Sequence, residues 1–379
     1  MSGPLTGVTV LELSAIGPVP YGVQLLADLG ADVVRVDRVA AARGNPGFEA
    51  TMRGLSRNRR SVAIDLRQDA GRDLLLRLVV DADVLVEGFR PGVLERLGLG
   101  PDVLLEANPG LVVARVTGWG QEGPMAHLAG HDIDYAAISG ILHTVGRADD
   151  PVPPVNYLAD FGGGGAFLAI GVLAALVERD TSGRGQVVDV AMVDGAASLS
   201  TFVHGLRALG AWKDRREANL LDGANPIYDT YRCSDGGFVA VGALEPQFHA
   251  ELAARLGLEV DELAVHDESR WAEAKQRLAA VFAEHPRDHW AELFADSDAC
   301  VAPVLSLDEA PRHPHNVARE AFVEVEGHPM PAPAPRFSRT PGAVVSDPPD
   351  VGAQTDEVLA TLGLDDDERA ALRAADVIG

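Results

Sequence analysis

Short apolar strands alternate with helices of about ten residues through the first third of this 379-residue chain. Residues 8–13 predict a strand, 21–29 a helix that ends at Gly30, and 31–37 a second strand. A strand that returns through a helix to the same sheet pairs parallel with its predecessor. The chain is therefore predicted to build a mostly parallel sheet covered by helices. Further strands and helices of this alternation are predicted at 61–66, 69–80, 83–89, 93–97, 102–107 and 111–117.

The second half of the chain changes character near residues 222–226. Before that point we predict a helix at 164–179, a strand at 186–192 and a long helix at 194–211. After it, a β-hairpin and amphipathic helices indicate a smaller domain, at 227–232, 238–241, 247–256, 269–283 and 288–295.

The predicted fold class is therefore α/β, with a large domain on a Rossmann-like, mostly parallel sheet and a smaller α+β domain. The proline-rich tract 329–341 predicts an extended connector. The expected boundaries are 1–190 for the large domain, 191–224 for a linker helix region, 225–316 for the small domain, 317–341 for the connector and 342–379 for a C-terminal segment that returns to the large domain.

Charge is unevenly distributed along the chain. The net charge of −24 argues against nucleic acid or an anionic membrane as a partner. Between Arg35 and Arg96, however, twelve arginines accompany nine acids. The planar guanidinium fork suits phosphate, so the cluster Arg57-Asn58-Arg59-Arg60 is a candidate anion-binding feature, with a solvated charged face as the alternative.

Several classes of protein are excluded by what the sequence lacks. The turn at 16–20 has no Gly-x-Gly-x-x-Gly, and no phosphate-binding loop ending in Gly-Lys-Ser/Thr occurs. Two cysteines, Cys233 and Cys300, are too few for a disulfide framework or a metal site, and we expect both to be buried thiols. The apolar run 167–177 is too short to span a membrane, and no secretory signal is evident, so we expect a cytoplasmic protein.

The segment Gly130-His131-Asp132 places a histidine and an acid where a helix is predicted to begin. A lone histidine is usually structural, but N–H groups at a helix start are free to bind a developing oxyanion. We therefore consider His131 a candidate base. We expect the backbone N–H of Asp132 to contact the oxyanion, and the Asp132 side chain to cap the helix.

The segment Asp160-Phe161 is followed by four glycines, Gly162 to Gly165. Asp160 alone would be read as a helix N-cap. Four glycines exceed what capping needs, because glycine costs about 1 kcal/mol relative to alanine inside a helix. We interpret them as room for close approach by a ligand. His131 and Asp160, each at a predicted helix start, then form a candidate two-base site for proton transfer.

A third acid, Glu245, lies where a strand of the small domain turns into a helix, in Gly242-Ala243-Leu244-Glu245-Pro246-Gln247. It is most simply an ordinary first-turn acid. The functional alternative is that it orients His131 and raises its basicity, as carboxylates behind histidines do.

In order and spacing, these three segments resemble the family III CoA-transferase superfamily of CaiB/BaiF type, and most of all its α-methylacyl-CoA racemase branch. The resemblance covers nearly the whole chain. It implies that His131 and Asp160 are the acid/base pair, with Glu245 paired to His131. It also implies a homodimer interlocked like chain links, with each active site between one protomer's large domain and the other's small domain.

The resemblance extends to the arginine-rich stretch and implies which residues bind CoA, here part of the substrate rather than a cofactor. No metal and no other cofactor is implied. The implied contacts are Arg38, Ile64, Asp65, Leu66, Arg67, Gly88, Phe89, Arg90, Pro91, Gly92, Arg96, Gly130 and Tyr135.

The favoured function is a racemase that interconverts (2R)- and (2S)-2-methylacyl-CoA in fatty acid metabolism, through an enolate. The alternative is a CoA-transferase in which Asp160 is a nucleophile that forms an acyl anhydride. A non-catalytic acyl-CoA-binding subunit is a third possibility, which would leave His131, Asp160 and Glu245 unused. Racemases of this family can line the acyl site with many methionines, whereas this chain has five in all, so breadth of acyl tolerance does not follow from the resemblance.

Overall fold

The computed structural model describes residues 3–44 and 48–379, and the chain divides into two compact units. Unit 1 comprises Met1–Ser139, Val155–Leu199 and Arg319–Gly379, and unit 2 comprises Gly140–Pro154 and Ser200–Ala318. Residues 140–154, expected in the large domain, therefore belong with the small one. Within unit 2, Arg147 of this segment pairs with Glu217 at 3.2 Å and with Asp229 at 3.0 Å, partners far away in sequence.

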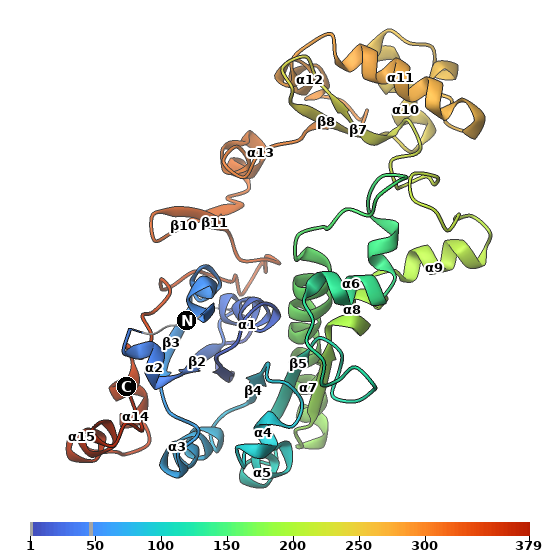
Figure 1. The fold of residues 1–379 in the computed structure, drawn as a ribbon. Helices are drawn as coiled ribbons and strands as arrows, with labels where there is room; N and C mark the ends of the chain where they lie inside the picture. The colour runs from blue at the N-terminus through green and yellow to red at the C-terminus, as the bar shows by residue number, and fades with distance from the viewer. Residues whose placement is uncertain (1–2, 45–47) are drawn as a thin grey trace. The chain divides into compact units, whose positions relative to one another are not determined.

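Unit 1 is built on a six-stranded sheet in which every neighbouring pair is parallel (Figure 1). The predicted α/β class with a parallel sheet is confirmed. The strand order is β3-β2-β1-β4-β5-β6, so the direction of winding reverses between β1 and β4. The strands are β1 (Thr9–Leu13), β2 (Asp32–Asp37), β3 (Arg59–Ala63), β4 (Val84–Glu87), β5 (Val112–Thr117) and β6 (Val187–Ala191).

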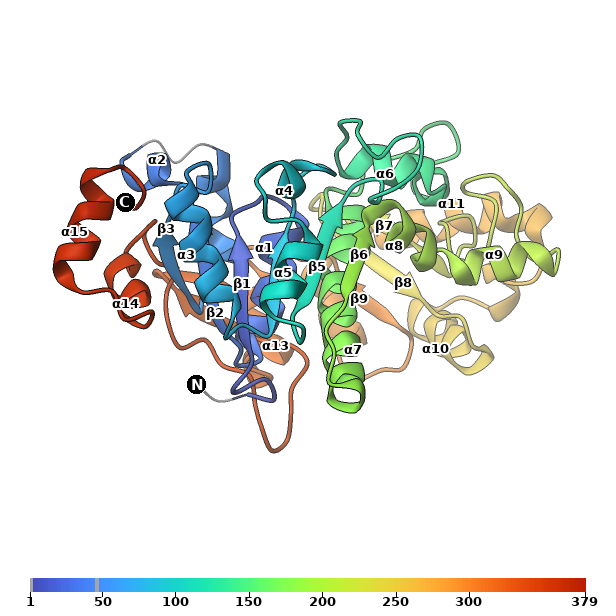
Figure 2. The same cartoon turned by 90° about the horizontal axis from the view of Figure 1, so that it is seen from below.

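Both faces of this sheet are buried, because alternate side chains of each strand point to opposite faces. In β1, Leu11 and Leu13 join one core cluster, whereas Val10 joins the other. Helices α3 and α5 cover the first face, and α1 and α7 cover the second (Figure 2). The helices of this unit before residue 140 are α1 (Pro18–Asp28), α2 (Val39–Ala42), η1 (Phe48–Leu55), α3 (Asp69–Val79), α4 (Val93–Arg96), α5 (Pro101–Ala107) and α6 (Asp132–Ile138).

The helix predicted at 164–179 begins seven residues earlier than expected. It starts as a π-helix, η3 (Tyr157–Ala166), and continues as α7 (Phe167–Ser182). Among the described residues this is one helix long and apolar enough to cross a membrane. Leu168, Val172 and Leu176 are nevertheless buried in the core against the sheet, as in the core helix of a globular domain.

Unit 2 has a three-stranded antiparallel sheet in the order β7-β8-β9. The hairpin was predicted, but β9 was not, because three residues carry too little pattern. The predicted helix 194–211 is two helices separated at Ser200, α8 in unit 1 and α9 in unit 2. The bounds are α8 (Met192–Leu199), η2 (Ile141–Thr144), α9 (Thr201–Ala208), β7 (Tyr228–Arg232), β8 (Phe238–Gly242), α10 (Pro246–Leu256), η4 (Val260–Leu263), η5 (Glu268–Arg270), α11 (Trp271–Phe282), α12 (Arg287–Phe294), β9 (Val301–Pro303), η6 (Ala310–Arg312) and α13 (Pro314–Ala318).

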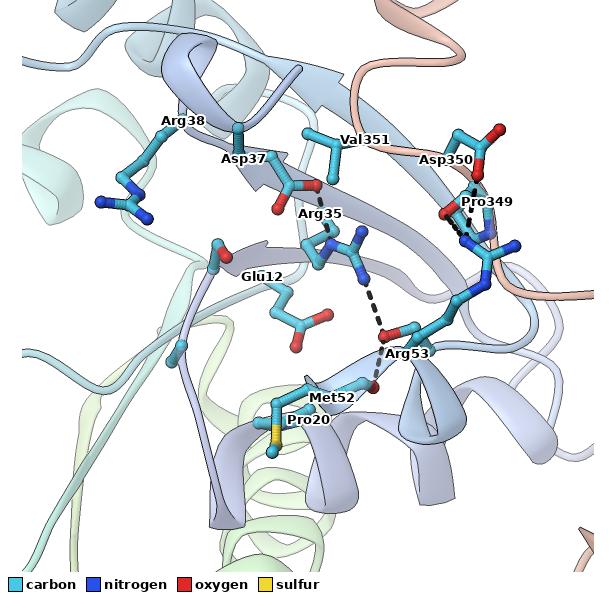
Figure 3. Close-up of a pocket in the computed structure, with 14 residues that line it drawn as sticks. Glu12, Pro20, Arg35, Asp37, Arg38, Met52, Arg53, Pro349, Asp350 and Val351 are labelled. Carbon is cyan, nitrogen blue, oxygen red and sulfur yellow. Dashed lines mark hydrogen bonds and ion pairs between the residues drawn. The ribbon is translucent and has the colours of Figure 1, made fainter. Parts of the chain in front are cut away.

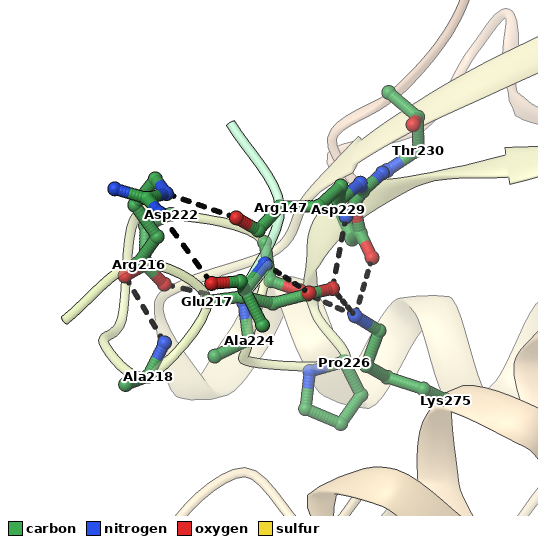
Figure 4. A network of polar contacts seen from close by, with 12 residues as sticks. Arg147, Arg216, Glu217, Ala218, Asp222, Ala224, Pro226, Asp229, Thr230 and Lys275 are labelled. Atoms are coloured by element: carbon green, nitrogen blue, oxygen red, sulfur yellow. Dashed lines mark hydrogen bonds and ion pairs between the residues drawn. The ribbon is translucent and has the colours of Figure 1, made fainter. Parts of the chain in front are cut away.

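A network of ion pairs joins the loops of unit 2 to its sheet (Figure 4). Lys275 pairs with Glu217 at 3.0 Å and with Asp229 at 2.9 Å, and Arg147 contacts the same two acids. Lys213, the other lysine of the chain, pairs with Glu268. Both lysines therefore have structural carboxylate partners.

The tract predicted as an extended connector is partly a hairpin in unit 1, β10 (Phe322–Val325) with β11 (His328–Pro331). Proline is tolerated there because a two-stranded ribbon consists only of edge strands. The C-terminal segment contains α14 (Thr355–Ala360) and α15 (Asp366–Ala374), and its end returns to the large sheet. Ile378 bridges to Ile64, and the Gly379 N–H donates to the Ala63 carbonyl at 3.1 Å.

The arginine cluster at 57–60 is structural, which corrects the expectation of a phosphate site there. Arg57 pairs with Asp28 at 2.6 Å, and Arg59 with Glu12 at 2.6 Å, all four being almost completely buried. Figure 3 shows the polar cavity beside Glu12, about 180 Å³ in volume, where Arg35 bridges Asp37 and Ser56. Sequence reasoning missed these pairs because the partner acids lie thirty to fifty residues earlier.

We predict that Asp28→Ala lowers the free energy of unfolding by about 3–5 kcal/mol, because it leaves the Arg57 guanidinium buried without its partner. The matched control is Asp32→Ala, whose partner Arg60 is 30% exposed and where a loss of about 1 kcal/mol or less is expected. Urea unfolding of both variants provides the comparison. Equal losses would contradict the assignment of the Arg57 pair as a buried structural element.

Candidate functional site

A cavity of about 310 Å³ opens at the carboxyl ends of β1, β4 and β5. It lies at the point where the strand order reverses, the usual place for a ligand in an open parallel sheet. The loops 16–19, 88–91 and 116–119 form its walls. His131 and Asp160, paired on sequence grounds, both line this cavity. The structure thus brings the two candidate bases together.

The backbone of His131 is held at the start of α6 by the side chain of Asp134. His131 occupies the N-cap position, and its N–H donates to the Asp134 carboxylate at 2.9 Å. The predicted helix cap is therefore made by Asp134 and not by Asp132. The His131 side chain is exposed, so its imidazole can reach a ligand in the cavity.

Asp160 lies inside the first half of the π-helix η3, so the interpretation as an N-cap is wrong. Burial raises the pKa of Asp160 to about 6, against an opposing hydrogen bond from Asn156 at 3.4 Å. The charge of Asp132 raises this pKa further, and His131 lowers it. A carboxyl whose pKa is about 6 approaches the ordinary value of a histidine, which suits exchange of acid and base roles.

The start of helix α1 faces Asp160 and offers it few donors. A Cβ added to Gly17 would lie 3.3 Å from Oδ2 of Asp160, so the two segments are adjacent. Helix N-termini normally stabilise anions through free N–H groups. Here Pro18 and Pro20 have no N–H, and the N–H of Gly17 donates to the Met52 sulfur at 3.4 Å. The sequence Pro18-Val19-Pro20 already shows that this helix start lacks N–H groups. That Asp160 lies beside it is seen only in the structure.

The glycines after Asp160 face protein and not ligand, which corrects their interpretation. A Cβ at Gly163 would lie 2.6 Å from the Ala196 backbone nitrogen, on α8. A Cβ at Gly164 would lie 2.7 Å from Pro18 Cβ, on α1. The glycines therefore let η3 pack tightly between α1 and α8. That packing fixes Asp160 relative to the α1 loop that lines the same cavity.

The loop Gly88–Gly92 is shaped by a buried acid beneath it. Glu87 ends β4, is fully buried, and accepts the Phe89 N–H at 2.6 Å. Arg115 of β5 pairs with Glu87 at 2.7 Å and with Glu95 at 2.8 Å. Burial raises the pKa of Glu87, and the hydrogen bond from Arg115 opposes this. None of these three charged residues was singled out from the sequence.

A second cavity, about 470 Å³, adjoins the first along the same edge of the sheet. Phe89 lines both cavities. Most residues proposed to bind CoA line one or the other. The first cavity has Gly88, Phe89, Arg90, Pro91, Gly130 and Tyr135, and the second has Arg38, Ile64, Asp65, Leu66, Arg67 and Phe89.

The remaining predicted residues lie outside both cavities. Gly92 is the N-cap residue of α4 and Arg96 is its last residue, and the Arg96 guanidinium lies beside Gly92. Asp132 is buried behind His131. Glu245 is the exposed N-cap residue of α10 in unit 2.

Two chemical expectations can be compared with the structure. Cys233 is buried as expected, but Cys300 is exposed, so the expectation of two buried thiols is wrong. Within residues 3–44 and 48–379 no three His, Cys, Asp or Glu side chains are grouped as metal ligands would be.

The raised pKa of Asp160 predicts an effect on stability. Between about pH 4 and pH 6 the unfolded chain releases this proton before the folded one does, so folding weakens as the pH rises through that window. We expect Asp160→Asn to unfold at higher urea concentration than the wild type at pH 7.5, with the difference vanishing near pH 4. Asp180→Asn, at the exposed end of the same helix, controls for net charge. A less stable Asp160→Asn protein at pH 7.5 would contradict this.

Known proteins resemble the chain along almost its entire length. The α-methylacyl-CoA racemases of Mus musculus and Homo sapiens are 46% and 44% identical to it, covering 96% and 99% of this chain and 94% and 97% of their own. A CaiB/BaiF family protein from Brucella suis has the same fold, with a TM-score of 0.79, 28% identity, and coverage of 96% of this chain and 100% of its own. Residues 5–355 match the model of CoA-transferase family III. The chain belongs to CoA-transferase family III.

Proposed function

We propose that this protein is an α-methylacyl-CoA racemase, an isomerase that interconverts (2R)- and (2S)-2-methylacyl-CoA thioesters. The observation that carries the proposal is that His131 and Asp160 line one cavity at the switch point of the sheet. The 44–46% identity to mammalian racemases supports this activity over that of the transferases in the same family.

In the proposed reaction, one of the two groups removes the proton from C2 of the thioester. The electron pair moves into the carbonyl, which becomes an enolate, and the backbone N–H of Asp132 donates to its oxygen. The other group returns a proton to the opposite face of C2. The raised pKa of Asp160 supports this exchange, because both groups must be able to hold the proton.

The alternative is a CoA-transferase in which Asp160 attacks the thioester. The same residue would serve, so Asp160 alone does not separate the two functions. His131 favours the racemase, because anhydride formation at Asp160 needs no second base in the cavity. Proton transfer uses both side chains.

We place the CoA moiety along the two adjoining cavities. The second cavity contains Arg38 and Arg67 and would hold the nucleotide end, whose phosphates suit guanidinium groups. The pantetheine arm would pass Phe89 into the first cavity, bringing C2 of the acyl group to His131 and Asp160.

We further propose a homodimer, in which Glu245 of the partner subunit pairs with His131. Apolar surface supports an association of this kind. In unit 1, Ile170 and Val177 are 58% and 70% exposed, and α9 of unit 2 has no buried residue. Fatty acid metabolism and a cytoplasmic location, both expected from the sequence, belong to the same proposal.

We expect His131→Ala and Asp160→Ala each to abolish racemisation, because the two groups act on opposite faces of one carbon. Each variant should still exchange the C2 proton of one enantiomer with D2O, since one base survives. Chiral separation with mass spectrometry measures both. Racemisation above about 10% of wild type in either variant would overturn the pair.

We expect Arg38→Ala to raise KM for acyl-CoA roughly tenfold with kcat less affected, because a phosphate contact far from C2 binds ground and transition states alike. Arg72→Ala is the matched control, an arginine of the same stretch that lines neither cavity and pairs with Asp69. Steady-state kinetics distinguish them. An unchanged KM in Arg38→Ala would show that the nucleotide end of CoA binds away from Arg38.

The shared site predicts complementation between two inactive variants. When His131→Ala and Glu245→Ala chains are co-expressed, half of the randomly paired dimers are mixed, and one of the two sites in each mixed dimer has both residues. Activity should recover to about a quarter of wild-type sites. No recovery, with mixed dimers isolated through two different affinity tags, would place both residues in one chain.

A further inference from the structure

Asp132 connects the two candidate bases through its side chain. It is the first residue of α6 and directly follows His131. Its Oδ1 accepts the backbone N–H groups of Ala159 and Asp160, both at 2.8 Å. Those N–H groups belong to the first turn of η3, which has no partners for them within the helix. One carboxylate therefore spans the segment that carries His131 and the segment that carries Asp160.

The charge of Asp132 is poorly compensated. The residue is 7% exposed, and its Oδ2 atom has no hydrogen-bond partner among the described residues. No arginine or lysine is paired with it in the part of the chain that the structure describes. The two charged groups that act on the pKa of Asp160 both lie at the start of α6: Asp132 raises it and His131, the N-cap residue, lowers it.

Of the groups that act on the pKa of Asp160, Asn156 and His131 lower it, and Asp132 raises it. Arg90, of the loop Gly88–Gly92, lines the same cavity, and its charge acts on Tyr135. Asn156, from its own element, donates a long hydrogen bond at 3.4 Å. Burial, and then the charge of Asp160, raise the pKa of Tyr135 of α6 to about 12, so Tyr135 stays neutral. The start of α1 contributes Gly17 and no ionisable group.

We propose that Asp132 is a positioning residue for racemisation: its side chain fixes Asp160 relative to His131, and its negative charge opposes a second negative charge on Asp160. This inference rests on the proposed function and adds a role for the side chain to that of the backbone N–H. It explains why an acid, and not merely a hydrogen-bond acceptor, occupies this place. An ordinary aspartate is more than a hundredfold less basic than a histidine. With such a difference, His131 and Asp160 would not be equally able to remove and to return the C2 proton.

Two substitutions separate position from charge. Asp132→Asn keeps an oxygen that can accept both N–H groups but removes the charge. Asp132→Ala removes both. In Asp132→Ala we expect kcat to fall about a hundredfold with KM for acyl-CoA near that of wild type, because the bases are misplaced while CoA contacts remain. In Asp132→Asn we expect kcat much closer to wild type, and the acidic limb of the kcat/KM profile shifted to lower pH.

Asp134→Asn is the control, because Asp134 lies in the same turn and contacts the His131 N–H but not Asp160. Its acidic limb should stay where the wild-type limb lies. An Asp132→Asn profile that coincides with wild type, or an Asp132→Ala enzyme with wild-type kcat, would overturn the inference. The proposed function fails separately, if the wild type itself does not racemise 2-methylacyl-CoA in the same assay.

Discussion

The reversal of strand order between β1 and β4 is the constraint on which the rest of the site depends. The chain leaves two adjacent parallel strands at this point toward opposite faces of the sheet. The loops that follow the strands therefore diverge at the carboxyl edge, and a crevice lies between them. In this chain the crevice is widened by the loops 16–19 and 88–91, and it becomes the cavity that His131 and Asp160 line. The strand order of the sheet therefore sets the position of the cavity, and the side chains of His131 and Asp160 supply its chemistry.

Packing then decides where the two bases lie. The π-helix carrying Asp160 contacts α1 and α8 through glycines, and a Cβ on Gly163 or Gly164 would meet backbone or proline atoms. Asp132 connects the same π-helix to the start of α6, beside His131. Burial in this packed position raises the pKa of Asp160, and the charge of Asp132 raises it further. The packing of η3 against α1, α8 and the start of α6 therefore fixes both the position and the burial of Asp160.

The sequence predicted the parallel sheet well, because alternating apolar strands and helices of ordinary length leave few alternatives. It also identified His131 and Asp160, which the structure places in one cavity. It failed where a partner lies far away along the chain. Arg57 was predicted to be a phosphate ligand, but it pairs with Asp28. The glycines after Asp160 were predicted to face a ligand, but Gly163 packs against α8. The grouping of residues 140–154 with unit 2 also differs from the expected boundary, and the partners of Arg147 in that unit lie far away along the chain.

In the proposed reaction the enzyme moves a proton at C2 and transfers no CoA. Incubation of the wild-type protein in D2O with pure (2S)-2-methylacyl-CoA and no acceptor acid separates proton transfer from CoA transfer. We expect the (2R) enantiomer to accumulate and to carry deuterium at C2 from the first turnovers, until the two thioesters approach equal amounts. Unchanged enantiomeric purity and no deuterium at C2, with transfer of CoA to a carboxylic acid in a parallel incubation that contains one, would show a CoA-transferase instead.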